Sequence, residues 1–233
     1  MVTDARRDPA AAGFLGALVA AQEDDGKALS DEALVASLRL IVLGGHETIS
    51  ATLAWMTVTL AHQPELWDAL VAEAGDAKEI PTTPEQARAF PYAEALFRET
   101  VRMHPPFSTI TRLAVEDTTF YGKRVARGTM VAIDIWGAAH DAATFPDPDT
   151  FLPSRWLGRG GSPSALEISQ FGAGPHFCLG YHLAWLEAVE LAVALAREGK
   201  RLGKRPRLRS KGLPESTFLP TEHPPTGTRV DFV

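Results

Sequence analysis

Hydrophobic positions recur at helical spacing through the first hundred residues, and this pattern predicts a mainly helical first half. Ser30 is a good N-cap, because the acidic residues Asp31 and Glu32 follow it in the expected first turn. From there a helical pattern continues to about His62. Because it is apolar nearly all round, we expect a central buried helix. Further helices are expected at 14–22, 64–75 and 91–103, with a loop at 76–89.

The pattern changes after residue 105, where short apolar runs separated by turn residues predict strands. We expect them at 109–115, 118–121 and 130–136, with a last pair of short strands near the C-terminus. The Pro- and Gly-rich segment 143–174 is expected to be irregular, and a final long helix to run from Leu179 to about Glu198. The predicted fold class is therefore mainly α with small β-sheets.

Composition narrows the function classes. The chain has 233 residues with 23 Lys and Arg against 29 Asp and Glu, and its formal net charge of −6 argues against nucleic acid as the main partner. A single cysteine excludes an internal disulfide framework and any multi-cysteine zinc or iron–sulfur site. The N-terminus has no signal-peptide core, and the apolar run 51–61 is too short to cross a bilayer. We therefore expect a soluble cytoplasmic protein without membrane contact.

The single cysteine lies in a glycine-rich loop, F-G-A-G-P-H-F-C-L-G at 171–180, directly before the last long helix. Such a loop allows the backbone to approach a flat ligand closely. It also presents a lone sulfur at a helix N-terminus, where the helix dipole stabilises a thiolate. A buried unpaired thiolate is costly, and coordination to iron removes that cost because a ligating thiol is deprotonated. The alternative is a buried cysteine that only fills the core.

The loop resembles the haem-binding loop of the cytochrome P450 family, whose pattern is F-G-x-G-x-H/R-x-C-x-G. Every fixed position of that pattern matches, namely Phe171, Gly172, Gly174, His176, Cys178 and Gly180. The resemblance implies that Cys178 is the proximal ligand of the iron in haem b, and that its electron-rich sulfur promotes O–O cleavage. It also implies that His176 hydrogen-bonds a haem propionate.

A second segment, G-G-H-E-T at 44–48 in the long helix, is similar to the family's [A/G]-G-x-[D/E]-T. By that resemblance the glycines open a groove for dioxygen over the iron, and the catalytic residues Glu47 and Thr48 relay protons to the oxygen. Taken alone, these residues are also compatible with a packing notch followed by a solvated pair.

Three charged residues match the family's scaffold motifs. Glu99 and Arg102 match E-x-x-R, and Arg155 matches the arginine of F-x-P-x-R. The resemblance implies a buried cluster under the haem with a structural role, whereas the spacing alone indicates a surface ion pair. Arg112 resembles the arginine that pairs with a haem propionate. The alternative interpretation is that Arg112 is an ordinary surface residue of a strand.

The resemblance also implies contacts to a hydrophobic substrate from three segments, although any of these residues could equally belong to the core. They are Leu40, Ile41, Leu43 and Gly44 in the long helix, Phe107, Ser108, Thr109 and Ile110 after the paired prolines, and Thr217, Phe218 and Leu219 in the late turn. The basic stretch 200–211 could steer an acidic electron donor or could be a solvated loop.

The family's catalytic domain is nearly twice as long as this chain, which corresponds to its C-terminal half. We therefore expect residues 1–233 to form a single incomplete haem-binding domain. Residues 1–104 would be its helical part, with the oxygen-activation and E-x-x-R helices, and 105–233 would hold the short strands, the cysteine loop and the last helix. The chain would be a fragment or a truncated homologue, with an apolar face left for the missing N-terminal half.

The resemblance implies a haem-thiolate monooxygenase that inserts one oxygen atom from O2 into a hydrophobic organic substrate. Its electrons would come from NAD(P)H through a redox partner, a ferredoxin or a flavoprotein reductase. Two alternatives stay open. One is a non-catalytic haem-binding or interaction remnant, and the other is a peroxygenase or isomerase on the same scaffold.

Overall fold

A computed structural model describes residues 2–8, 10, 13–21, 26–158, 164, 167–218 and 221–233. Leu219 and the expected end of the first helix at Gln22 lie outside these ranges. The chain divides into two compact units, Met1–Glu47 and Thr48–Val233, and each is described by itself.

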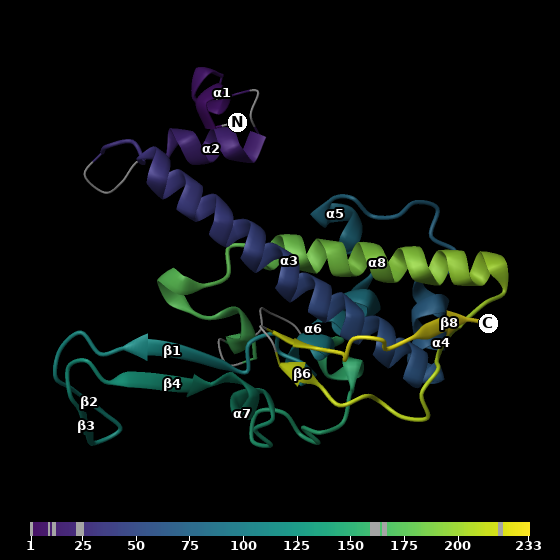
Figure 1. Cartoon of the computed structure of the whole chain (residues 1–233). Helices are drawn as coiled ribbons and strands as arrows, with labels where there is room; N and C mark the ends of the chain where they lie inside the picture. Colours follow the sequence, from purple (N-terminus) through teal and green to yellow (C-terminus); the bar gives the residue numbers. More distant parts are fainter. Residues whose placement is uncertain are drawn as a thin grey trace. The chain divides into compact units, whose positions relative to one another are not determined.

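Helices make up most of the described elements, with short strands between the sixth and eighth α-helices and near the C-terminus (Figure 1). The helices are α1 (Val2–Arg7), α2 (Gly13–Ala20), α3 (Asp31–His62), α4 (Pro64–Ala74), α5 (Pro84–Ala87), α6 (Pro91–Met103), α7 (Ile135–Ala139) and α8 (Tyr181–Leu202), with the 3-10 helices η1 (Pro153–Trp156), η2 (Ser169–Phe171) and η3 (Gly174–His176). The strands are β1 (Thr109–Leu113), β2 (Thr118–Phe120), β3 (Lys123–Val125), β4 (Met130–Asp134), β5 (Pro206–Leu208), β6 (Thr217–Phe218), β7 (Glu222–His223) and β8 (Val230–Phe232).

In the first unit a small apolar cluster joins α1 and α2 to the start of α3. Ala5, Val19 and Leu34 are its buried members. The Ser30 hydroxyl accepts a hydrogen bond from the Ala33 N–H at 3.1 Å, so the predicted N-cap of the long helix is confirmed.

Apart from Leu34 near its start, helix α3 has buried residues only in its second half. Trp55 and Met56 are buried, whereas Leu40 is 70% and Leu43 is 61% exposed. The expected buried helix is therefore wrong for the first half, because burial depends on the segments that pack on a helix and not on its composition alone. By length and composition α3 could also cross a membrane, a test that the core helix of a soluble protein passes too.

The core of the second unit lies between α4, α6, α8 and the end of α3. Leu70, Leu96, Phe97, Val189 and Val193 are almost fully buried there. Helices α4 and α6 have the proline starts that the sequence predicted, and α6 has the predicted bounds. A carboxylate from α4 caps α6, because Glu73 accepts hydrogen bonds from the N–H groups of Tyr92 (2.7 Å) and Ala93 (3.0 Å).

The strands form antiparallel pairs. In the pair β1–β4, Thr109 is opposite Asp134 and Leu113 is opposite Met130. The strand expected at 130–136 ends earlier, because the Asp134 carboxylate accepts the Gly137 N–H at 2.8 Å and so caps α7. Two further elements are missing from the prediction, β3 opposite β2 and α5 in the expected loop, where Thr83 and Gln86 form a capping box.

Near the C-terminus β5 pairs with β8, and β6 pairs with β7 in a short hairpin. The basic stretch 200–211 contains β5, and several of its cations are paired with acids. Arg205 binds Asp68 at 2.8 Å, and Arg209 binds Asp231 at 2.7 Å. These pairs reduce the positive field that a steering patch would need.

Candidate functional site

Cys178 lies in the cysteine loop, residues 171–180, between η3 and α8. Its N–H donates to the carbonyl of Phe171 at 2.8 Å, and its own carbonyl accepts the Tyr181 N–H at 3.3 Å. The backbone around the cysteine is thus held on both sides, while its thiol is free and its side chain exposed. Exposure does not fit the alternative of a cysteine that only fills the core.

Two glycines give this loop its curvature. Gly172 has φ +76° and Gly174 has φ +57°, both in the left-handed region. A Cβ at Gly172 would also lie 2.8 Å from the carbonyl oxygen of His176. At Gly180 a Cβ would lie 3.9 Å from the Cys178 sulfur, an ordinary contact, so the described chain itself does not require glycine there.

Aromatic contacts fix the base of the loop to the core. The Phe171 ring packs edge-on against Tyr181 with centroids 4.8 Å apart, and it also contacts Phe97 of α6 at 6.0 Å. Apolar side chains that follow Cys178 closely in the sequence are turned to the surface, since Leu179 is 80% and Leu183 is 60% exposed. A sulfur flanked by exposed apolar side chains fits a large, flat, apolar group that covers them.

The two residues expected to bind propionates are exposed. His176 ends η3 in the cysteine loop, and Arg112 lies on β1 opposite Val131. The Arg112 guanidinium donates to the carbonyl of Thr111 at 2.9 Å, which leaves donors for an acid from outside the chain.

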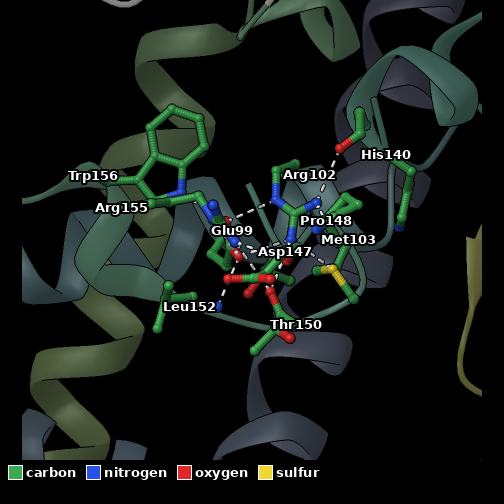
Figure 2. A network of polar contacts seen from close by, with 12 residues as sticks. Glu99, Arg102, Met103, His140, Asp147, Pro148, Thr150, Leu152, Arg155 and Trp156 are labelled. Carbon is green, nitrogen blue, oxygen red and sulfur yellow. Dashed lines mark hydrogen bonds and ion pairs between the residues drawn. The ribbon is translucent and has the colours of Figure 1, made fainter. Parts of the chain in front are cut away.

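The structure brings Glu99, Arg102 and Arg155 together in a buried polar cluster (Figure 2). Arg102 donates to both carboxylate oxygens of Glu99, Nε to Oε2 at 2.9 Å and Nη2 to Oε1 at 2.8 Å, and Arg155 Nε donates to Oε1 at 3.0 Å. The Leu152 N–H and the Trp156 indole N–H each complete the shell at 2.8 Å. Glu99 and Arg102 have fully buried side chains, which excludes the alternative of a surface pair.

The two arginines also bind the end of α7 and the loop that follows it. Arg102 Nη1 donates to the carbonyls of Ala139 (2.9 Å) and Pro148 (2.7 Å). Arg155 Nη1 donates to the carbonyl of Pro146 at 2.9 Å, and Asp147 presents its carbonyl to Arg155 Nη2 from a left-handed conformation with φ 52°. The cluster thus replaces the lost hydration of its charges with hydrogen bonds.

The expected proton-relay residues are consecutive on α3, where the two units meet in the chain. In the first unit Glu47 lies 3.5 Å from His46 Nδ1, with 40% of its side chain exposed. In the second unit the carbonyl of Thr48 accepts the Thr52 hydroxyl at 3.0 Å. A Cβ at Gly44 or Gly45 would meet nothing within 4 Å in the described chain, so no described residue fills a packing notch there.

Most residues expected to contact substrate are not core residues. The exposed ones are Leu40, Leu43, Gly44, Phe107, Thr109, Thr217 and Phe218, and those of intermediate exposure are Ile41, Ser108 and Ile110. Residues 107–110 lead into and begin β1, and Phe218 lies on β6 opposite Glu222.

Sequence reasoning missed two contributions to this region. Trp156 directly follows Arg155, and its position after the arginine motif is the signal that could have indicated its bond to Glu99. The second is the bond between His104 and Glu222, which are 118 positions apart and share no motif.

The cytochrome P450 family model matches residues 4–197. Cytochrome P450 BJ-4 of Bradyrhizobium diazoefficiens is 41% identical over 231 residues, which are 99% of this chain and 52% of that protein. Human cytochrome P450 4F12 is 33% identical over 193 residues, 78% of this chain and 36% of that protein. The solved structure of retinoic acid-bound cyanobacterial CYP120A1 is similar with a TM-score of 0.85 and 25% identity, over 100% of this chain and 53% of that one. The chain spans about half the length of these bacterial relatives, and it belongs to the cytochrome P450 family.

Proposed function

We propose that this chain carries the haem-thiolate machinery of a monooxygenase that inserts one oxygen atom from O2 into a hydrophobic organic substrate. The observation that carries the proposal is the exposed, backbone-anchored Cys178 among exposed apolar side chains in a member of this family. The retinoic acid bound to CYP120A1, a largely apolar molecule, supports a hydrophobic substrate.

Haem b would sit on the cysteine loop, with Cys178 as the ligand of its iron. When bound, haem supplies dioxygen activation, which an electron-rich thiolate ligand promotes. Phe171, Gly172, Gly174 and Gly180 would shape the loop. The Arg112 guanidinium would pair with a propionate, and the His176 ring would hydrogen-bond a propionate.

The remaining site residues would act on protons, substrate and scaffold. Glu47 would pass protons from solvent to Thr48, whose hydroxyl would deliver them at the oxygen-binding side. Leu40, Ile41, Gly44, Phe107, Thr109, Ile110 and Phe218 would line the substrate region. Glu99, Arg102 and Arg155 would hold the scaffold and take no part in the chemistry.

We also propose that residues 1–233 form one incomplete haem-binding domain. The share of the relatives' length that the chain covers supports this, and so do the exposed apolar residues of α3, which a missing N-terminal half would cover. A ferredoxin or flavoprotein reductase would supply electrons from NAD(P)H. A cytoplasmic location is supported by the likeness to the bacterial relatives.

The carbon monoxide difference spectrum of the reduced, haem-loaded protein tests the ligand assignment. We expect the red-shifted Soret band of a thiolate-ligated haem, and we expect Cys178→Ala to abolish it while Thr57→Ala, on the buried half of α3, retains it. A wild-type spectrum without that band, or an unchanged spectrum in Cys178→Ala, overturns the proposal.

The main alternative is a haem-binding remnant without turnover, which the half-length match favours. Product formation with NAD(P)H and a redox partner separates the two functions. If product forms only with hydrogen peroxide, the protein is a peroxygenase instead. Haem binding without any product identifies a remnant.

A further inference from the structure

Glu222 is a buried carboxylate that joins segments far apart in the sequence. Its side chain is only 3% exposed, and its Oε1 contacts His104 Nδ1 at 2.9 Å and the Ser216 hydroxyl at 2.7 Å. Its backbone N–H donates to the carbonyl of Pro106 at 2.9 Å. A carboxylate only accepts hydrogen bonds, so His104 Nδ1 and the Ser216 hydroxyl are the donors.

His104 connects this carboxylate to the long helix. It directly follows α6, and its ring stacks on Trp55 of α3 with centroids 3.8 Å apart and an interplanar angle of 4°. Trp55 is 1% exposed. The other oxygen of Glu222, Oε2, has no hydrogen-bond partner among the described residues, so the carboxylate is oriented through Oε1 alone.

The residues that adjoin this pair are those proposed to contact substrate. Pro106 precedes Phe107 and the strand residues Thr109 and Ile110. On the other side, Glu222 lies opposite Phe218 in the hairpin β6–β7. The hydrogen bonds of Glu222 therefore hold the hairpin that carries Phe218 against the segment that carries Phe107.

We propose that His104 and Glu222 are a positioning pair that sets substrate selectivity. They fix the distance between residues 107–110 and the strand pair β6–β7, and so the spacing of the exposed apolar side chains of Phe107 and Phe218. This inference rests on the proposed function only for the substrate role of those two segments. A buried carboxylate that loses its donor is strongly disfavoured, which makes the bond a firm anchor.

Hydrogen–deuterium exchange tests the anchor without reference to haem. In His104→Phe the ring can still stack on Trp55 but cannot donate to Glu222, whereas His104→Asn keeps a donor near the position of Nδ1. We expect His104→Phe and Glu222→Ala to speed exchange at least tenfold in peptides covering 107–110 and 216–223, with α8 unchanged. His104→Asn should restore slow exchange, and Glu215→Gln, at an exposed acid in the same segment, should match wild type.

Ligand binding to the haem-loaded protein tests the selectivity. Imidazole and 4-phenylimidazole share a nitrogen that ligates haem iron and differ by one apolar ring. We expect Glu222→Ala and His104→Phe to weaken 4-phenylimidazole at least fivefold and imidazole less than twofold, with His104→Asn and Glu215→Gln near wild type.

Equal weakening of both ligands, or unchanged exchange in both segments, overturns the positioning role. Faster exchange throughout the chain also overturns it, because it identifies a general loss of stability. A wild-type protein without thiolate-ligated haem refutes the proposed function, and the exchange result then still decides whether the pair anchors the two segments.

Discussion

The N–H of Cys178 donates a 2.8 Å hydrogen bond to the carbonyl of Phe171, and this bond closes the loop before α8. Phe171 is itself fixed by its ring contacts with Tyr181 and Phe97. The sulfur is therefore positioned by backbone that is anchored in the core, while its side chain is exposed. If Cys178 ligates iron as proposed, a backbone held in this way has little conformational freedom to lose on binding.

Gly172→Ala should disrupt this loop. The residue has φ +76°, and an added Cβ would lie 2.8 Å from the His176 carbonyl oxygen. Gly128 is the matched control, because its φ is +84° but a Cβ there would meet nothing within 4 Å. We expect Gly128→Ala to lower the free energy of unfolding in urea by about 1 kcal/mol from backbone strain alone, and Gly172→Ala by about 2–3 kcal/mol. Equal losses would contradict the steric part of this explanation.

Glu99→Gln should be among the most damaging conservative changes in the chain. It keeps the shape of the side chain but removes the charge that faces Arg102 and Arg155, and leaves two buried cations uncompensated. We expect urea unfolding to show a loss of about 3–5 kcal/mol. Glu94→Gln, which affects the partly exposed pair with Arg98, should cost less than about 1 kcal/mol. A small loss for Glu99→Gln would mean that neutral hydrogen bonds suffice in the cluster.

Local signals predicted much of this fold. The starts of α4 and α6 follow from Pro64 and Pro91, whose fixed φ suits a first helical position. The end of β4 could not be predicted from local signals. The side chain of Asp134 caps α7, and this cap competes with the strand pattern of the residues that follow. The prediction that α3 is buried was wrong for its first half, because burial depends on which segments cover Leu40 and Leu43.

The candidate site also contains residues that the sequence predicted and residues that it did not. The family motifs predicted a cluster of Glu99, Arg102 and Arg155, and the structure joins these three side chains. Pro146 and Pro148, whose carbonyls help complete the shells of the arginines, belong to an irregular loop without a sequence signature, and only folding brings them to the cluster. His104 and Glu222 meet only in three dimensions for the same reason.

Arg112→Ala and His176→Ala should speed haem loss. Each exposed side chain would otherwise donate a hydrogen bond to a charged propionate, worth about 1.5–3 kcal/mol, which corresponds to about a tenfold to hundredfold faster release. Transfer of haem to apomyoglobin measures the rate. Arg124→Ala removes another exposed strand arginine, one paired with Asp117 instead, and should leave the rate unchanged. An effect of that size in Arg124→Ala would indicate a general charge effect.

Stability should fall in alkaline solution, with a contribution from Tyr92. Burial, with the negative charges of Glu73 and Glu65, raises the pKa of Tyr92 to about 12. An unfolded tyrosine loses its proton near pH 10, so between roughly pH 10 and 12 the folded state binds more protons and stability falls as pH rises. Urea midpoints measured from pH 9 to 11 should decline less steeply in Tyr92→Phe. Burial also raises the pKa of Tyr181, which is present in both proteins, so equal slopes would show that Tyr92 ionises normally.

Thr48→Ala tests the proton relay that the sequence motif implies. If the hydroxyl of Thr48 delivers protons for O–O cleavage, its loss should leave NAD(P)H consumption largely intact while electrons are diverted to hydrogen peroxide and water. We expect product formed per NAD(P)H to fall about a hundredfold, the lower end of the range for general acid–base catalysis.

Two variants separate this relay from a packing effect. Thr48→Ser keeps the hydroxyl and should restore coupling. Thr57→Ala removes a hydroxyl that is occupied within the same helix, by a 2.8 Å hydrogen bond to the carbonyl of Leu53, and should couple as well as wild type. The Thr52 hydroxyl donates to the backbone carbonyl of residue 48, which Thr48→Ala retains. We therefore expect no helix defect in Thr48→Ala. Unchanged coupling in that variant would therefore remove Thr48 from the relay, and Glu47 would then need another route for its proton.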